Sequence, residues 1–153
     1  MFLDKETFST VIANAPLISI DLIVKNSDDK VLLGQRVNKP AQNSWFVPGG
    51  RVYKEETIEN AFRRITEDEL GIQCKIESAS FKGIYQHFYD DNVFGDDFST
   101  HYIVLAFELR LTNTPMTNAQ HEKYLWFTEN ELLNSDDVYF FVKDYFDENK
   151  GIK

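Results

Sequence analysis

GRVYKEETIENAFRRITEDELGI, residues 50–72, is the stretch that decides the fold of this chain, and it directly follows a Val-Pro-Gly turn at 47–49. Residues 57–70 have helical spacing, and Gly71 stands where a helix commonly ends in a left-handed conformation. The apolar side chains of this helix fall in one sector of a helical wheel, which predicts a core-facing stripe. These residues are Ile58, Ala61, Phe62 and Ile65.

Glu69 falls in the same sector as the apolar stripe. A carboxylate among core-facing residues is unfavourable unless a cation neutralises it. Glu67 and Asp68 join it in the last helical turn, where the helix dipole disfavours anions. Because a hard divalent cation with oxygen ligands is the simplest neutralising partner, Glu69 is predicted to bind metal. Glu67 and Asp68 have an alternative, a solvated face on which they pair with Arg63 and Arg64.

The spacing Gly-x5-Glu-x7-Arg-x4-Glu-x-Gly-Ile resembles the Nudix box, the metal-binding segment of a family that hydrolyses nucleoside diphosphates linked to another moiety. The matching residues are Gly50, Glu56, Arg64, Glu69, Gly71 and Ile72. The resemblance implies an α+β Nudix fold, an α/β/α sandwich with a mixed central β-sheet and a loop-helix-loop metal site. An ion pair between Glu56 and Arg64 would be structural.

Two positions depart from the box. Ile65 stands where the pattern normally has glutamate, and Asp68 replaces the first of two closing glutamates. The apolar Ile65 extends the buried stripe and removes one metal ligand. One Mg²⁺ per subunit, with Mn²⁺ as an alternative, is therefore expected in place of a site with several metal ions.

Composition narrows the class of protein. The 153 residues, 14% of them aromatic, predict one domain spanning residues 1–153 with a single substantial core. A net charge of −9 argues against nucleic acid or an anionic membrane as a partner. No apolar run approaches the length of a membrane span. The single cysteine, Cys74, excludes an intrachain disulfide and favours a cytoplasmic location.

The remaining elements follow from periodicity and turn signals. Strands are expected at 17–24, 30–36, 45–47, 75–88 and 100–111, and further helices at 4–15, 128–133 and 138–148. The acidic, aromatic loop 89–97 is either a lid over the substrate or an ordinary surface loop.

Several polar residues outside the helix are candidates for a site. Asp21 alternates with apolar residues, so it lies either on a wet face or in a pocket wall. Arg36, Lys39 and Arg51 bring positive charge near the start of the helix, and guanidinium groups suit diphosphate oxygens. Gly49 lets the backbone approach a ligand closely, so its carbonyl is a candidate metal ligand.

Over nearly its full length, the chain is similar to the GDP-mannose mannosyl hydrolases, an atypical Nudix group that cleaves a carbon–oxygen bond. The segments that carry the similarity are 1–3, 40–42, 45–52, 86–92, 100–102, 120–121, 124 and 126. The similarity implies hydrolysis of GDP-mannose, and of GDP-glucose as a second substrate, to GDP and free hexose. Water would attack the anomeric carbon with inversion.

The same similarity implies a role for each candidate residue. Metal would be held by Gly49, Glu69 and Gln120, and His121 would act as the general base. Arg36 and Arg51 would neutralise charge on the departing GDP. The sugar or the bridging oxygen would be held by Asp21, His87 and Tyr102. The guanine would lie against the N-terminal segment of the second subunit of a homodimer, at Phe2, Leu3 and Phe8.

Two other functions remain open. A Nudix pyrophosphohydrolase would attack phosphorus and release GMP and a sugar 1-phosphate, but the carboxylate missing at Ile65 argues against it. The second alternative is a nucleotide-sugar sensor that binds its ligand without catalysis. The presence of Glu69, Gln120 and His121 argues against that function.

Overall fold

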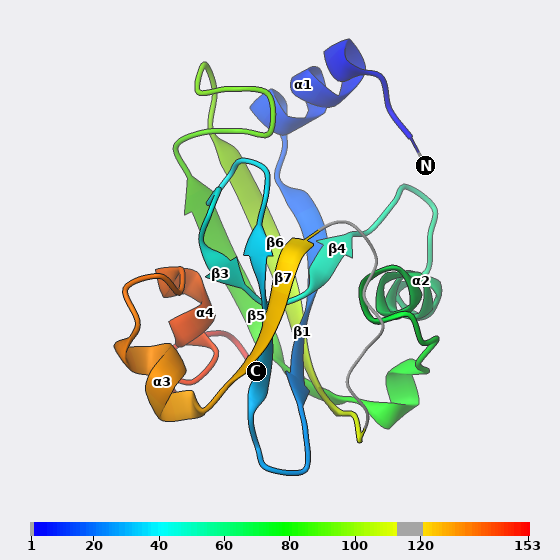
Figure 1. Cartoon of the computed structure of the whole chain (residues 1–153). Helices are drawn as coiled ribbons and strands as arrows, with labels where there is room; N and C mark the ends of the chain where they lie inside the picture. The colour runs from blue at the N-terminus through cyan, green and yellow to red at the C-terminus, as the bar shows by residue number, and fades with distance from the viewer. Residues whose placement is uncertain (1, 113–120) are drawn as a thin grey trace.

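The computed structural model describes residues 2–112 and 121–153, apart from the side chains of His121 and Glu122. Its centre is a seven-stranded mixed sheet with the order β3-β2-β1-β6-β5, in which β4 also pairs with β1 and β7 with β2 (Figure 1). The strands are β1 Leu17–Lys25, β2 Val31–Arg36, β3 Trp45–Phe46, β4 Gly49–Arg51, β5 Ser80–Tyr89, β6 Thr100–Arg110 and β7 His121–Phe127.

Helices cover both faces of the sheet, as the expected α/β/α sandwich requires (Figure 1). One face packs against α2, and the other against α3 and α4. The helices are α1 Lys5–Asn14, α2 Ile58–Leu70, α3 Glu129–Asn134 and α4 Phe140–Asp144, with a 3-10 turn at Ile76–Ser78. No helix in the described part of the chain is long and apolar enough to cross a membrane.

The central strand β1 is buried on both faces, by α2 on one side and by α3 and α4 on the other. Its residues Ile20, Leu22 and Val24 pack against α2, as their alternation predicts. On the opposite face, which carries Asp21, Ile23 is fully buried beneath α3 and α4. Asp21 is consequently enclosed by protein and does not lie on a wet face.

Helix α2 has the expected bounds and ends at Gly71 as predicted, and the structure shows its N-terminal cap. The Thr57 side chain accepts a hydrogen bond from the Asn60 N–H at 3.1 Å, and Gly71 ends the helix with φ of 74°. Ala61, Phe62 and Ile65 are buried, but Ile58 is exposed, because the packed part of the helix begins one turn after its first residue. The predicted stripe is therefore correct except at its N-terminal end.

Two predicted elements differ in the structure. Residues 76–78 form a 3-10 turn instead of the start of a strand, because the Ser78 N–H and hydroxyl both donate to the Lys75 carbonyl. The last helix is shorter than 138–148. Its expected first residues are extended and pair with β3, since the Tyr139 N–H donates to the Trp45 carbonyl at 3.1 Å.

Two of the other helices, α1 and α3, also begin with a side-chain cap. Asp4 accepts a hydrogen bond from the Thr7 N–H at 2.8 Å and caps α1. Thr128 and Glu131 form a capping box at the start of α3.

Candidate active site

A cavity of about 90 Å³ opens where β1, β2 and β4 meet. Strand β1 pairs with β4 so that Asp21 is opposite Gly49 and Ser19 opposite Arg51. In the described chain β4 pairs with β1 and has no strand on its other edge. Glu69 of α2 and residues of the sheet line the same cavity. The wall is formed by Ser19, Asp21, Arg36, Pro40, Phe46, Val47, Gly49, Gly50, Arg51, Glu69, His87, Tyr89 and Tyr102.

Asp21 is 7% exposed and contributes its carboxylate to the wall. The Tyr145 hydroxyl donates a hydrogen bond to its Oδ2 atom. Burial raises the pKa of Asp21 to about 7, although the Tyr145 hydrogen bond and the charge of Arg36 act in the opposite direction. Asp21 is thus a carboxylate that changes charge near neutral pH.

Glu69 reaches the cavity from α2 and is 4% exposed. The Gly49 N–H donates to its Oε1 atom at 3.4 Å. Burial raises the pKa of Glu69 to about 7, while hydrogen bonds from Gly49 and Tyr124 lower it. The prediction that Glu69 lies on the buried stripe is confirmed.

The residues around Glu69 fit one hard divalent cation. Among the side chains of residues 2–112 and 123–153, no group of three or more His, Cys, Asp or Glu is arranged to hold a metal ion. A cation beside Glu69 therefore needs main-chain, amide or substrate oxygens as further ligands, which are the donors that Mg²⁺ accepts. Gly49 adjoins Glu69 and offers such a carbonyl. Gln120 lies outside the described residues.

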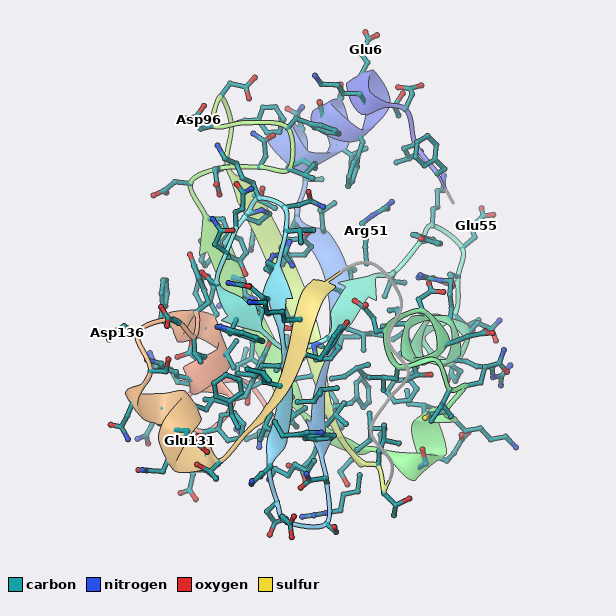
Figure 2. The ribbon with its side chains drawn as sticks, viewed as in Figure 1. Glu6, Arg51, Glu55, Asp96, Glu131 and Asp136 are labelled. Atoms are coloured by element: carbon teal, nitrogen blue, oxygen red, sulfur yellow. The ribbon has the colours of Figure 1, made fainter. Side chains whose placement is uncertain are left out.

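Two arginines line the cavity, and each is oriented by neighbours. The Arg36 Nε–H donates to the Pro40 carbonyl at 2.8 Å, and the guanidinium lies 5.9 Å from the centre of the Phe46 ring. The Arg51 guanidinium lies 4.8 Å from the centre of the Phe8 ring, and Figure 2 shows it extending from β4 toward α1. Both cations are placed to meet an anionic ligand.

A second cavity, of about 210 Å³, adjoins the first. The two share a wall made of Gly49, Gly50, Arg51 and Glu69. On the far side the second cavity is lined by Phe8, Tyr53, Arg64, Ile65 and Asp68. An elongated ligand that crosses β4 can contact both cavities.

The predicted ion pair between Glu56 and Arg64 is present. Arg64 donates to both carboxylate oxygens, with Nε–Oε2 and Nη2–Oε1 distances of 2.8 and 2.9 Å. Its Nη2 also donates to the Arg51 carbonyl at 2.8 Å. This bidentate pair ties the loop before α2 to the helix and to β4, so its role is structural.

The other acids at the end of α2 lie on the solvated face. Glu67 is exposed and accepts a hydrogen bond from the Gln73 side chain at 2.7 Å. Asp68 is exposed and lies 3.6 Å from the Arg64 guanidinium. Both acids are therefore solvated as the alternative predicts, and Asp68 pairs with Arg64, but the partner of Glu67 is Gln73 and not an arginine. Asp68 also borders the second cavity.

His87 and Tyr102 line the first cavity from β5 and β6. The His87 ring stacks on Phe141 at 4.4 Å with an interplanar angle of 7°. Burial lowers the pKa of His87 to about 3, so this imidazole is neutral at physiological pH. Burial also raises the pKa of Tyr102, which keeps its hydroxyl protonated.

Of the N-terminal residues predicted to contact the base, only Phe8 lines one of the two cavities. Phe8 borders the second cavity of its own chain, whereas Phe2 is 96% exposed and, like Leu3, is not among the residues that line either cavity. The backbone of His121 pairs with Arg36 at the start of β7. Sequence reasoning did not identify Tyr145, because this residue lies 124 residues from Asp21 in the chain.

Gly49→Ala is expected to destabilise the fold as well as the site. A Cβ atom at position 49 would lie 2.5 Å from the Asp21 Oδ1 atom and 2.6 Å from the Ile20 carbonyl oxygen, and the latter cannot move without moving β1. We expect a loss of about 1–3 kcal/mol in the free energy of unfolding, measured by urea titration. Gly95→Ala is the matched control, because its nearest neighbour would be 3.7 Å away. Equal stability of the two variants would contradict the expected clash.

The two raised carboxyl pKa values predict how stability depends on pH in the absence of metal. The pKa of Glu69 rises from 4.5 in the unfolded chain to about 7 in the folded one, so the folded state holds its proton longer. The free energy of unfolding should therefore fall as pH rises from about 4.5 to 7, by on the order of 3 kcal/mol from this residue. Denaturant titrations in the presence of EDTA at several pH values measure this change in the free energy of unfolding.

Glu69→Gln provides the reference for that experiment. The difference in stability between wild type and Glu69→Gln isolates the contribution of this carboxyl group from all others, and Asp21→Asn does the same for Asp21. Added Mg²⁺ should reduce the fall at high pH, because a cation favours the ionised carboxylate. A difference that does not change with pH would contradict the prediction.

Comparison with known proteins supports the assignment of the fold. Residues 15–147 match the model of the NUDIX domain. The chain is 42% identical over 120 residues to the low-salt glycan biosynthesis protein Agl8 of Haloferax volcanii, covering 77% of this chain and 74% of that protein. It is 36% identical over 70 residues to the ADP-ribose pyrophosphatase of Methanocaldococcus jannaschii, covering 46% of this chain and 40% of the relative.

The solved structures agree. The MutT NUDIX hydrolase from Burkholderia pseudomallei superposes with a TM-score of 0.72 at 21% identity, covering 90% of this chain and all of that one. Nudix hydrolases act on nucleotide-linked substrates and generally use divalent metal ions such as Mg²⁺. With the NUDIX model covering most of its length and the helix carrying Glu69 folded as the Nudix box requires, this chain belongs to the Nudix family of hydrolases.

Proposed function

We propose that this chain hydrolyses GDP-mannose, and GDP-glucose as a second substrate, to GDP and free hexose. The observation that carries the proposal is the position of Ile65. This side chain is 1% exposed, and its Cγ1 atom lies 3.0 Å from where a Cβ of Gly50 would be. Ile65 therefore fills part of the core, at a position where the Nudix box normally has a glutamate.

The consequence for chemistry is a metal site with few carboxylates. Glu69 is the buried carboxylate of α2, while Glu67 and Asp68 are exposed. Attack on phosphorus benefits from several cations that clamp both the attacking and the leaving oxygen. A single cation beside Glu69, Gly49 and Gln120 suits a reaction in which the diphosphate is only the leaving group.

The arrangement of the two cavities supports a nucleotide sugar. We place the diphosphate across their shared wall, between Arg51 on that wall and Arg36 in the first cavity. The hexose then occupies the first cavity, which offers Asp21, His87 and Tyr102 as hydrogen-bonding groups. The second cavity offers the aromatic rings of Phe8 and Tyr53 for a base. In a homodimer, Phe2 and Leu3 of the partner subunit would complete the base site.

In the proposed reaction, water attacks the anomeric carbon on the face opposite the diphosphate, which inverts its configuration. The new C–O bond forms as the bond to the β-phosphate oxygen breaks, and that electron pair leaves with GDP. His121 takes the proton of the attacking water. Arg36 and Arg51 neutralise the charge that develops on GDP. When bound, Mg²⁺ would supply further positive charge at the same diphosphate.

The names of the two relatives favour different reactions. The Haloferax protein is named for glycan biosynthesis, which favours a sugar-linked substrate. The Methanocaldococcus relative is named a pyrophosphatase, which favours attack on phosphorus. The decisive difference between the two reactions is the atom that water attacks.

Hydrolysis in ¹⁸O-labelled water tests this difference. GDP-mannose, Mg²⁺ and the purified protein are incubated in labelled water, and the products are analysed by mass spectrometry. We expect the label in mannose, with GDP unlabelled, and β-mannose as the first anomer seen by NMR. Label in GMP or in mannose 1-phosphate would establish a pyrophosphohydrolase. Binding of GDP-mannose without turnover would establish a sensor.

A further inference from the structure

Tyr145 is a buried residue that joins two parts of the candidate site. It follows the last residue of α4 and is 2% exposed. Its hydroxyl donates to the Asp21 Oδ2 atom and lies 3.4 Å from the His87 Nε2 atom. Asp21 and His87 line the first cavity, whereas Tyr145 is not among the residues of that wall.

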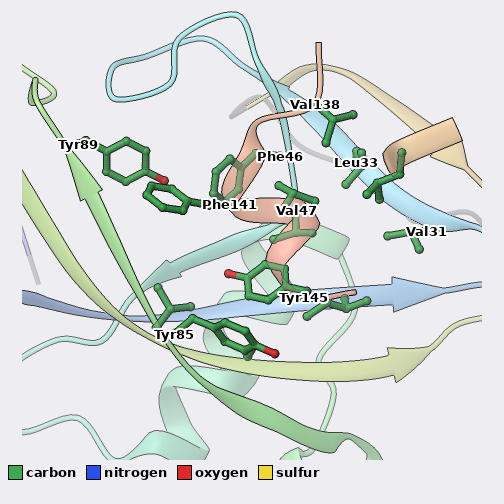
Figure 3. Close-up of a cluster of buried hydrophobic side chains, with 14 residues drawn as sticks. Val31, Leu33, Phe46, Val47, Tyr85, Tyr89, Val138, Phe141 and Tyr145 are labelled. Carbon is green, nitrogen blue, oxygen red and sulfur yellow. The ribbon is translucent and has the colours of Figure 1, made fainter. Parts of the chain in front are cut away.

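The Tyr145 ring is held firmly. It packs perpendicular to Tyr85, with ring centres 4.7 Å apart and an interplanar angle of 88°. Figure 3 shows it in the buried cluster close to Val47 and Tyr85. A ring fixed on several sides directs its hydroxyl along one line, so the position of the Asp21 carboxylate is fixed with it.

Segment 141–145 acts on the cavity wall through two residues. Phe141 stacks on the His87 ring, and Tyr145, four residues later, bonds to Asp21. Residues at this spacing lie on the same face of a helix. The C-terminal segment therefore forms a platform behind the part of the cavity where the hexose is proposed to bind.

The Tyr145 hydroxyl also predicts which ring nitrogen of His87 is protonated. A tyrosine hydroxyl has one proton, and here it is donated to Asp21. Its oxygen is left to accept a hydrogen bond, and we therefore expect His87, whose Nε2 atom lies 3.4 Å away, to face it with a protonated Nε2 atom. The Nδ1 atom of a neutral His87 then carries no proton.

We propose that Tyr145 is a positioning residue of this active site, which fixes the Asp21 carboxylate and the His87 ring toward the bound sugar. The proposal rests on the proposed function in assigning the sugar to this cavity. It assigns to the C-terminal segment a part in turnover, although Tyr145 itself touches no substrate.

Tyr145→Phe tests the proposal by removing only the hydroxyl. We expect kcat to fall about 10- to 100-fold, as for other groups that orient an active-site residue, while KM is unchanged. Tyr85→Phe is the matched control, because Tyr85 packs on the Tyr145 ring and is not a residue of the cavity wall. Its kcat should equal that of wild type. An unchanged kcat in Tyr145→Phe would overturn the proposal.

A double-mutant cycle separates positioning from structural damage. If Tyr145 acts through Asp21, Tyr145→Phe should reduce kcat much less in an Asp21→Asn background than in wild type. Full additivity of the two losses would overturn this mechanism. The cycle can use whichever nucleotide sugar is turned over, so ¹⁸O in phosphate would refute the proposed reaction without deciding the role of Tyr145.

A measurement on the unmutated protein covers the case in which Tyr145→Phe does not fold. Long-range ¹H–¹⁵N correlation spectra of the imidazole groups identify the protonated nitrogen of each histidine. We expect His87 to be neutral with its proton on Nε2. A proton on Nδ1 would show that the Tyr145 hydroxyl does not hold this ring, and would overturn the proposal.

Discussion

Glu69→Gln is expected to raise the Mg²⁺ concentration needed for half-maximal activity by at least about 100-fold. Removing a group that merely orients a metal ligand weakens metal affinity by about 10- to 100-fold, and removal of the ligand charge itself should exceed this. Glutamine keeps the size and the carbonyl oxygen of the side chain, so packing of α2 is preserved. The measurement is kcat as a function of Mg²⁺, together with Mn²⁺ binding by electron paramagnetic resonance.

The control for Glu69→Gln is the same substitution two residues earlier. Glu67 is on the same helix, but it is exposed and bonded to Gln73. Glu67→Gln should therefore keep the metal dependence of wild type. Metal affinity that is unaltered in Glu69→Gln would refute the assignment of Glu69 as a ligand, whatever happens to kcat.

His121→Gln is expected to lower kcat by about 10²- to 10⁴-fold, the usual contribution of a general base. An imidazole can take a proton from water near neutral pH, whereas a glutamine amide does not. The affinity for GDP-mannose should remain nearly that of wild type, because the base acts on water. Single-turnover kinetics at saturating Mg²⁺ measure the chemical step, and calorimetric titration measures the affinity.

His101→Gln is the matched control for this second experiment. His101 stacks on Phe88 with ring centres 4.4 Å apart, and it is not a residue of the first cavity. Its substitution should leave kcat unchanged. If His121→Gln lowers affinity and turnover by the same factor, His121 binds substrate and is not the base.

Local patterns in the sequence predicted the features that depend on residues close together in the chain. The bounds of α2 and its Gly71 terminus depend on residues within one or two helical turns. The burial of Glu69 follows from its place on the apolar stripe, and the Glu56–Arg64 pair from the box spacing. The shorter last helix was not predictable in this way, because its expected first turn pairs instead with β3, about 90 residues earlier in the chain.

By itself, the sequence determined the Nudix box, the family and the acidic residue that faces the core, since spacing along one helix decides which side chains share a face. Only the tertiary structure decided that Asp21 is buried opposite Gly49, that two cavities share β4, and that Tyr145 holds Asp21 and borders His87. These contacts join residues far apart in the chain. They arise from strand pairing and layer packing, which no local pattern specifies.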